Sequence, residues 1–239
     1  MAFLDDDDEW LSQKLQVQLP IAENAGCSFP IISCRLIARS DEGDLIYPRR
    51  FPRANEPLCE YIFCQSGLIG GEGFVLPSTV LTTRELLQRV PFPSGLMRHD
   101  DLDWLLRAGA LKGAGVEFVP ASEPLVIWHI KRDHSRLSQS TDWRASLRWI
   151  HSSRHLVTPR AYAGFVLTWA SVAAQRSGEW RAFFVLLREA GRHGRPRVID
   201  VMAHLTIWLI PRRIRRRVVS WLDARRQQTP KPDILPSPQ

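Results

Sequence analysis

The chain has 239 residues, of which 44% are hydrophobic and 24% charged, and this predicts a globular protein of one large domain or one domain with an appendage. The net charge of +7 is uneven, because residues 5–9 are all acidic whereas residues 212–226 hold seven arginines. This asymmetry predicts one cationic and one anionic partner. None of the four cysteines is spaced as CxxC, which argues against a zinc knuckle.

The first part of the chain alternates between helix and strand patterns. Residues 1–4 are typical of the end of a buried strand that leads into a loop, and residues 9–19 have helical spacing with Leu15 and Leu19 on the apolar face. Thr82 or Thr83 is expected to cap a helix that ends near residue 90, with Glu85 in a capping box. The remaining patterns predict strands at 31–38, 74–81, 116–119 and 125–130, helices at 58–64 and 100–111, a turn at 41–44 and loops at 48–57 and 67–73.

From Asp142 onward the pattern is helical throughout. We expect helices at about 142–153, 158–176, 179–191, 197–209 and 211–227. The apolar run 198–210 is shorter than the ~20 residues that a membrane-spanning helix needs, so no such helix is expected. The chain is therefore predicted to divide into a mixed α/β part (1–138), an all-helical part (139–227) and a disordered, proline-rich tail (228–239).

Four aspartates, Asp5 to Asp8, follow the first apolar run directly. Mg²⁺ and Mn²⁺ prefer oxygen ligands and bridge carboxylates to substrate phosphates. Alternate carboxylates at a strand end point to the same side, so Asp5 and Asp7 are suited to bind one cation together. The alternative is a solvated acidic terminus, because like charges in a row are usually exposed.

A second acidic cluster opens the helix expected at 100–111. Asp100, Asp103 and Arg107 lie at helical neighbour positions, whereas Asp101 is offset and is free to face another partner. A carboxylate near a cleft can act as a general base toward a hydroxyl group. The alternative is that these acids only compensate the helix dipole, with Asp103 and Arg107 forming an ion pair.

The first acidic segment carries a family resemblance. Residues 3–10, FLDDDDEW, resemble the FLDxDDxW segment of the family 2 glycosyltransferases, which have the Rossmann-like GT-A fold. The resemblance implies that Asp5 and Asp7 are the DxD pair and Asp8 the acid after it. It further implies that these residues bind the diphosphate of a nucleotide-sugar donor through Mn²⁺ or Mg²⁺.

Two later segments extend the resemblance. Residues 100–107, DDLDWLLR, are similar to the family's EDxxLxxR helix, whose second acid is the general base; this implies that role for Asp101. Residues 78–87, followed by Pro91 and Phe92, resemble the stretch that lines the acceptor side. The acceptor side implied by these two segments comprises Ser78, Thr79, Asp100 and Trp104.

The segment 129–138 resembles the loop that closes the GT-A core, where a histidine completes the metal shell in many enzymes. His134 is favoured for this role over His129. The resemblance thus implies an α/β fold, the C-terminal half of a GT-A nucleotide-sugar transferase domain, followed by an all-helical region. In the family, several βα units precede the DxD segment, so we expect an upstream start, a fragment, or an N-terminal half supplied from elsewhere.

The implied function is that of an inverting, metal-dependent glycosyltransferase in bacterial surface-polysaccharide synthesis. Residues 211–226 alternate arginines with apolar residues, as an amphipathic basic helix does. Such a helix either lies on the inner face of an anionic membrane, near a sugar or lipid-linked acceptor, or packs on its own domain. Nucleic acid is disfavoured as a partner because the sequence contains no recognisable motif for it. The alternative function is a catalytically incompetent fragment that binds a membrane or partner through its basic helices. Either way we expect a cytoplasmic protein, because four cysteines without CxxC spacing fit a reducing compartment.

Overall fold

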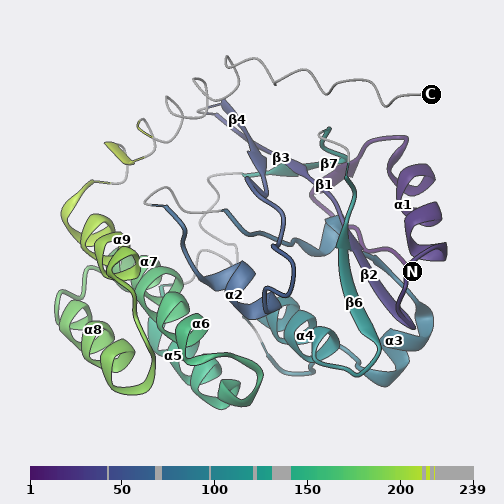
Figure 1. Ribbon diagram of the computed structural model, residues 1–239. Coiled ribbons are helices and arrows are strands. Elements are labelled where there is room, and N and C mark those ends of the chain that lie inside the picture. The colour runs from purple at the N-terminus through teal and green to yellow at the C-terminus, as the bar shows by residue number, and fades with distance from the viewer. Residues whose placement is uncertain are drawn as a thin grey trace, which may run out of the picture.

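The computed structural model describes residues 1–41, 43–67, 72–96, 98–120, 123–130 and 141–211, together with residues 214, 215 and 218. Figure 1 shows strands on one side of the molecule and the last five helices on the other, with α2 and α4 between them. The strands are β1 (Asp8–Trp10), β2 (Phe29–Ser33), β3 (Leu36–Ser40), β4 (Gly43–Tyr47), β5 (Leu81–Thr82), β6 (Ala114–Phe118) and β7 (Val126–His129). The helices of the α/β part are α1 (Lys14–Glu23), α2 (Leu58–Phe63), α3 (Arg84–Arg89) and α4 (Asp100–Gly109).

The described strands form two small sheets. One has the order β1-β7-β3-β4 and the other the order β5-β2-β6. Each sheet contains one parallel pair, β3 with β7 and β2 with β6, and the remaining pairs, β1 with β7, β3 with β4 and β2 with β5, are antiparallel. The expected mixed α/β class is confirmed, and the arrangement is compatible with a Rossmann-like glycosyltransferase fold.

The prediction of a helix over 9–19 is wrong about where the helix begins and about which of its faces is buried. Residues Asp8–Trp10 form β1, which pairs with β7 about 120 residues later, so tertiary pairing overrides the local helical spacing. Helix α1 begins only at Lys14. It buries Lys14 and Gln18 and leaves Leu15 and Leu19 exposed, the reverse of the expectation.

Two expected strands also differ from the structure. The run 31–38 is divided into β2 and β3, which belong to different sheets, and β4 was not anticipated. The run 74–81 contains a 3₁₀ turn, η1 (Pro77–Thr79), before β5, because Pro77 has no N–H to donate to a sheet. The expected strand end at residues 1–4 is reduced to one bridge between Ala2 and Leu81.

The other elements of the α/β part follow the predictions closely. Helices α2 and α4 and strands β6 and β7 are confirmed, and the turn before β4 contains Gly43 at a φ of 116°. Thr83, not Thr82, caps α3, since its Oγ1 accepts a hydrogen bond of 3.1 Å from Leu86 N. Glu85 pairs with Arg89 at 2.7 Å rather than completing a capping box.

The helical part confirms four of the five expected helices. The helix expected at 158–176 runs from Pro159 to Ser177 through a π-helical turn and stops at Gly178, which has a φ of 74°. The helix expected at 211–227 lies almost entirely outside the described residues. The elements are α5 (Trp143–Ser152), η3 (Arg154–Leu156), α6 (Pro159–Phe165), η4 (Val166–Ala170), α7 (Ser171–Ser177), α8 (Arg181–His193) and α9 (Val198–Leu209).

The two parts of the chain share one hydrophobic core. The rings of Phe63 in α2 and Phe165 in α6 lie 5.1 Å apart, and Glu60 accepts a hydrogen bond of 2.8 Å from Thr158. A Cβ at Gly164 would stand only 2.5 Å from the carbonyl oxygen of Phe63, so this close approach of α6 to α2 depends on glycine. Among the described helices, none has the length and apolar character needed to cross a bilayer.

Candidate active site

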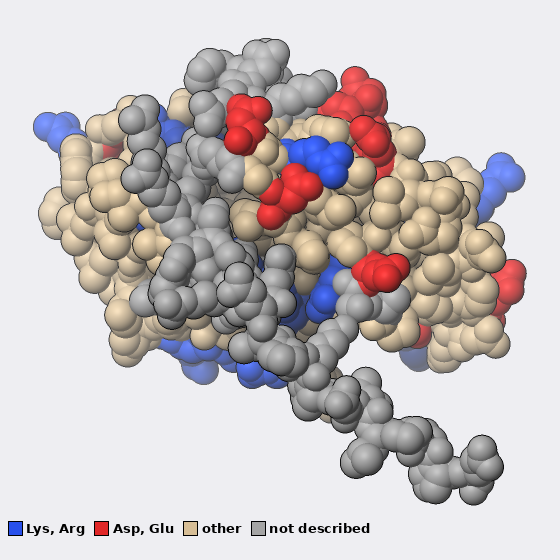
Figure 2. Space-filling model, turned by 90° about the horizontal axis from the view of Figure 1, so that it is seen from above, with Lys and Arg blue, Asp and Glu red and all other residues tan. Residues whose placement is uncertain are grey.

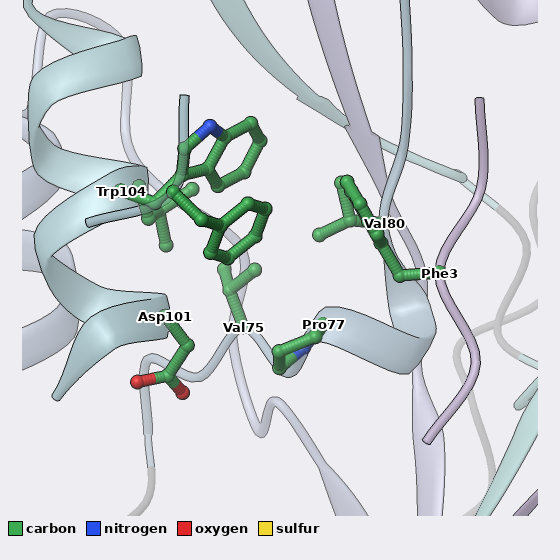
Figure 3. Close-up of a pocket in the computed structure, with 8 residues that line it drawn as sticks. Phe3, Val75, Pro77, Val80, Asp101 and Trp104 are labelled. Carbon is green, nitrogen blue, oxygen red and sulfur yellow. The ribbon is translucent and has the colours of Figure 1, made fainter. Parts of the chain in front are cut away.

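A small hollow lies between α4 and the N-terminal segment. Asp101 and Trp104 project from α4 on one side, and Phe3 and Val80 face them from the other (Figure 3). The Trp104 ring is 5.8 Å from the Phe3 ring and stacks on the Phe92 ring at 5.0 Å. The hollow thus has aromatic walls and one carboxyl group, that of Asp101, which Figure 3 shows beside Pro77.

The environment of Asp101 suits a group that exchanges protons near neutral pH. Burial, followed by the smaller effects of the negative charges of Asp100 and Asp5, raises the pKa of its carboxyl to about 6. A hydrogen bond of 2.7 Å from Leu102 N to Oδ1 acts in the opposite direction. A general base is most effective when its pKa lies near the working pH.

The first acidic segment folds into a tight turn rather than continuing as an extended strand. Asp8 N donates to Asp5 O at 3.2 Å, which brings the two ends of the segment together. Ser78 links these ends as well, because its Oγ donates to Asp8 Oδ2 at 2.6 Å and accepts from Asp5 N at 3.1 Å. Trp10 Nε1 donates to Ser78 O at 2.9 Å. Ser78 therefore holds the whole turn in place.

The two acidic clusters are within electrostatic reach of each other. Burial raises the pKa of Asp5, and the charges of Asp8, Asp7, Asp6 and, from the second cluster, Asp100 raise it further. Asp5 in turn raises the pKa of Asp101. Asp5, about 95 residues before Asp101 in the sequence, thus influences the pKa of the carboxyl group that lines the hollow.

A buried polar network contacts the segments next to the Ser78 turn. Lys14 is fully buried; its Nζ donates to Gln18 Oε1 at 2.7 Å and lies 4.3 Å from the centre of the Trp10 ring. Gln18 Nε2 donates to Thr79 O at 2.8 Å. Burial lowers the pKa of Lys14 to about 8. The sequence interpretation missed this network, and its only signal was the polar pair at positions i and i+4.

The residues expected on the acceptor side differ in their accessibility. Asp100 is exposed, whereas Ser78 and Thr79 are buried, with their hydroxyl groups hydrogen-bonded within the chain. Trp104 is only 2% exposed and its Nε1 donates to Val90 O at 2.8 Å. Trp104 can therefore meet a ligand only through its ring.

The structure places some of the expected metal ligands and not others. Asp5 and Asp7 share the acidic turn, but His134 lies outside the described residues. His129, the alternative, has its Nε2 2.7 Å from Glu9 Oε1. In the part of the chain that the structure describes, no three His, Cys, Asp or Glu side chains converge on one point. Mg²⁺ needs only one or two carboxylates when substrate phosphates supply further oxygens, so the acidic turn fits such an ion.

The neighbours of Asp101 on α4 have structural partners. Arg107 Nε lies 2.7 Å from Asp103 Oδ2, and Trp149 Nε1 donates to Asp103 Oδ1 at 3.2 Å, so the expected Asp103–Arg107 ion pair is confirmed. His99, with a φ of 64°, precedes the helix and is 2.9 Å from Ser146 Oγ. Burial lowers the pKa of His99 to about 3, so its ring is neutral. Among the acidic residues of α4, Asp101 is the one that lines the hollow.

A mixed α/β fold with an aromatic hollow that Asp101 lines is compatible with a glycosyltransferase of the Rossmann-like class. The chain is similar to the amylovoran biosynthesis glycosyltransferase AmsB of Erwinia amylovora, with 29% identity over 164 residues. The match covers 67% of this chain and 52% of AmsB, so the chain spans about half the length of this curated relative. No family model and no solved structure matches the chain. The similarity supports a glycosyltransferase family without singling out family 2.

Proposed function

We propose that this protein is a glycosyltransferase that moves a sugar from a nucleotide-sugar donor to an acceptor hydroxyl during synthesis of a cell-surface polysaccharide. The similarity to AmsB supports both the reaction class and the type of product. The observation that carries the proposal is the carboxyl group of Asp101 in the aromatic hollow, whose pKa is raised by burial and by the charges of Asp100 and Asp5. We further propose membership of family 2, on the basis of the FLDDDDEW and DDLDWLLR segments.

Asp101 is the proposed general base. Its carboxylate takes the proton of the acceptor hydroxyl as that oxygen attacks the anomeric carbon, and the bond to the nucleoside diphosphate breaks in the same displacement. A single displacement inverts the anomeric configuration. The raised pKa suits this task, because a carboxylate with a pKa of about 6 accepts a proton more readily than an ordinary aspartate does.

The acidic turn is the proposed donor-binding element. Asp5 and Asp7 would hold Mn²⁺ or Mg²⁺, which when bound offsets the charge of the diphosphate. Asp8 is held by Ser78 at 2.6 Å, so its part is to fix the turn in a shape that suits the diphosphate. His134 is the proposed further ligand of the cation.

The acceptor is proposed to enter over the aromatic walls of the hollow. Phe92, which is 37% exposed, stacks on Trp104 with an interplanar angle of 7°, and the flat apolar ring of Phe92 suits the C–H face of a sugar ring. Asp100, exposed at the start of α4, is placed to accept a hydrogen bond from an acceptor hydroxyl. Ser78 and Thr79 shape this side from within, through the turn that they form.

The test compares Asp101→Asn with Asp44→Asn, which alters an exposed ion pair with Arg39 on the β3–β4 hairpin. We expect Asp101→Asn to lower transfer at least about 10²-fold, because the proton acceptor is lost, while Mn²⁺-dependent binding of a nucleoside diphosphate persists. Asp44→Asn should leave both properties unchanged. Unaltered turnover in Asp101→Asn would remove Asp101 from the mechanism.

A second candidate is a non-catalytic module that binds a membrane or partner at the inner face of the membrane. The observation that favours it is the set of exposed apolar side chains on the last helices, including Phe184 and Leu209. Vesicle or partner binding, combined with no metal-dependent affinity for nucleoside diphosphates, would favour this candidate over the transferase.

A further inference from the structure

Helix α9 exposes an apolar stripe instead of burying it. Val198, Met202, Leu205 and Leu209 are 77%, 43%, 38% and 65% exposed, respectively. They are spaced i, i+4, i+7 and i+11, so they form one face of the helix. The opposite face, with Ala203, Ile207 and Trp208, packs into the core. Isolated exposed apolar residues are ordinary, but a continuous helical stripe of them marks an interaction site.

Helix α8 extends this surface. The rings of Phe183 and His204 stack at 4.7 Å, and Trp180 lies 5.2 Å from Trp208, so α8 is joined to α9 along one side. Figure 1 shows the two helices side by side at the outer end of the helical part. Phe184 is 69% exposed and Val185 is 45% exposed on the outer face of α8. We call the exposed side chains of α8 and α9 the outer face.

The outer face is also basic. Arg181, Arg188 and Arg192 are exposed on α8 and recur at the helical spacing of Phe184 and Val185. Residues 180–210, which contain α8 and α9, hold five arginines against two acidic residues, Glu189 and Asp200, whereas residues 1–179 have more acidic than basic residues. On the face seen in Figure 2, most acidic patches lie away from the left-hand end, where Figure 1 places the helical part.

We propose that the outer face binds the surface of an anionic lipid bilayer. A bilayer surface offers phosphates to the arginines and an apolar layer just beneath them to Leu205, Leu209 and Phe184. Helix α9 has 12 residues, fewer than the ~20 needed to span a bilayer, so it lies along the surface.

Charge argues against a second copy of the chain as the occupant. A symmetric dimer would bring the arginines of α8 against the same arginines of the partner, which costs energy, whereas an anionic surface neutralises them. Nucleic acid would match the arginines but not the apolar stripe of α9. The lipid surface is the occupant that satisfies both properties of the outer face.

The experiment is flotation of the full chain with vesicles of phosphatidylcholine, alone or mixed with phosphatidylglycerol. We expect binding to the mixed vesicles that weakens at high salt, and little binding to phosphatidylcholine alone. The double variant Leu205→Gln/Leu209→Gln should bind roughly tenfold more weakly, because it removes two apolar contacts. Leu15→Gln/Leu19→Gln, which changes two exposed leucines of α1, is the matched control and should bind as the unaltered chain does.

Circular dichroism of each variant establishes that the fold is kept. Equal vesicle binding by the unaltered chain and by Leu205→Gln/Leu209→Gln would overturn the proposal. The proposal would also be overturned if light scattering showed a dimer of the unaltered chain that Leu205→Gln/Leu209→Gln abolishes, and if the unaltered chain did not bind vesicles. Nucleoside diphosphate binding is measured separately, so failure here leaves the transferase proposal standing.

Discussion

The α/β part and the helical part both bury a serine at the centre of a polar network, but the networks end differently. In the α/β part, Ser78 joins Asp5 and Asp8, and the charge of Asp5 helps to raise the pKa of Asp101 in the hollow. In the helical part, Ser171 Oγ is 2.9 Å from His204 Nδ1 and accepts a hydrogen bond of 2.9 Å from Trp208, and all three groups are buried. The first network presents charge to a ligand, whereas the second fastens one helix to another.

Replacing each serine by alanine is the strongest way to test this difference. Both Ser78→Ala and Ser171→Ala leave buried polar groups without a partner, so each should lower the free energy of unfolding by about 1–3 kcal/mol. Only Ser78→Ala should also lower transfer, by roughly tenfold to a hundredfold, because the acidic turn loses its link. Chemical denaturation and donor-binding titrations measure the two effects. If Ser171→Ala impaired transfer as much as Ser78→Ala while both variants were fully folded, the distinction between a ligand-facing and a structural network would fail.

The same division governs what the sequence could predict. Helices α5 to α9 depend on contacts between residues three or four apart, so their periodicity located them within a few residues. Strand β1 depends on β7, about 120 residues away, and its local pattern therefore indicated a helix. The burial of Lys14 and Gln18 was missed for the same reason, because polar residues are read as solvent-facing unless a distant partner is known.

The sequence likewise predicted the candidate site only in part. The acidic residues Asp5 and Asp101 were identified from their motifs, because the chemistry of a residue is visible in the sequence. The stretch that ends with Phe92 was assigned to the acceptor side, but the link through Ser78 Oγ and the contact of the Phe92 ring with Phe3 were not anticipated. Both depend on packing between segments about 70 to 90 residues apart, which no local pattern encodes.

A smaller effect is expected on the free energy of unfolding when the close approach of the two parts at α2 and α6 is disturbed. Gly164→Ala should lower the free energy of unfolding by about 1–3 kcal/mol, because a methyl group there would lie 2.5 Å from Phe63 O. Gly191→Ala, on the outside of α8 with no atom within 4 Å of an added Cβ, should instead stabilise by about 0.5–1 kcal/mol. Thermal denaturation of both variants measures the two changes in the free energy of unfolding. Equal effects would mean that the two parts are not held together at this contact.

The pH dependence gives the finest comparison, because Asp101 in the α/β part and His204 in the helical part affect stability with opposite signs as the pH changes. Asp101 must be ionised to act as a base, so kcat/KM should fall about tenfold per pH unit below its pKa of about 6. The same raised pKa means that Asp101 favours the folded state at low pH and that this contribution is lost as the pH rises through about 6. Burial lowers the pKa of His204, so the unfolded chain takes up the proton first and the contribution of His204 to stability falls as the solution becomes more acidic.

Two variants separate these contributions. Asp101→Glu keeps a carboxyl group but moves it, and should retain the acid limb of any residual activity, whereas His204→Gln should leave the pH–rate profile of transfer unchanged. His204→Gln should instead flatten the loss of unfolding free energy between pH 7 and pH 5, because the neutral amide does not titrate. Rate profiles and denaturation curves at each pH record the two quantities independently. A shift of the acid limb in His204→Gln would show that the helical network reaches the site, and the division between a ligand-facing network and a structural one would then have to be abandoned.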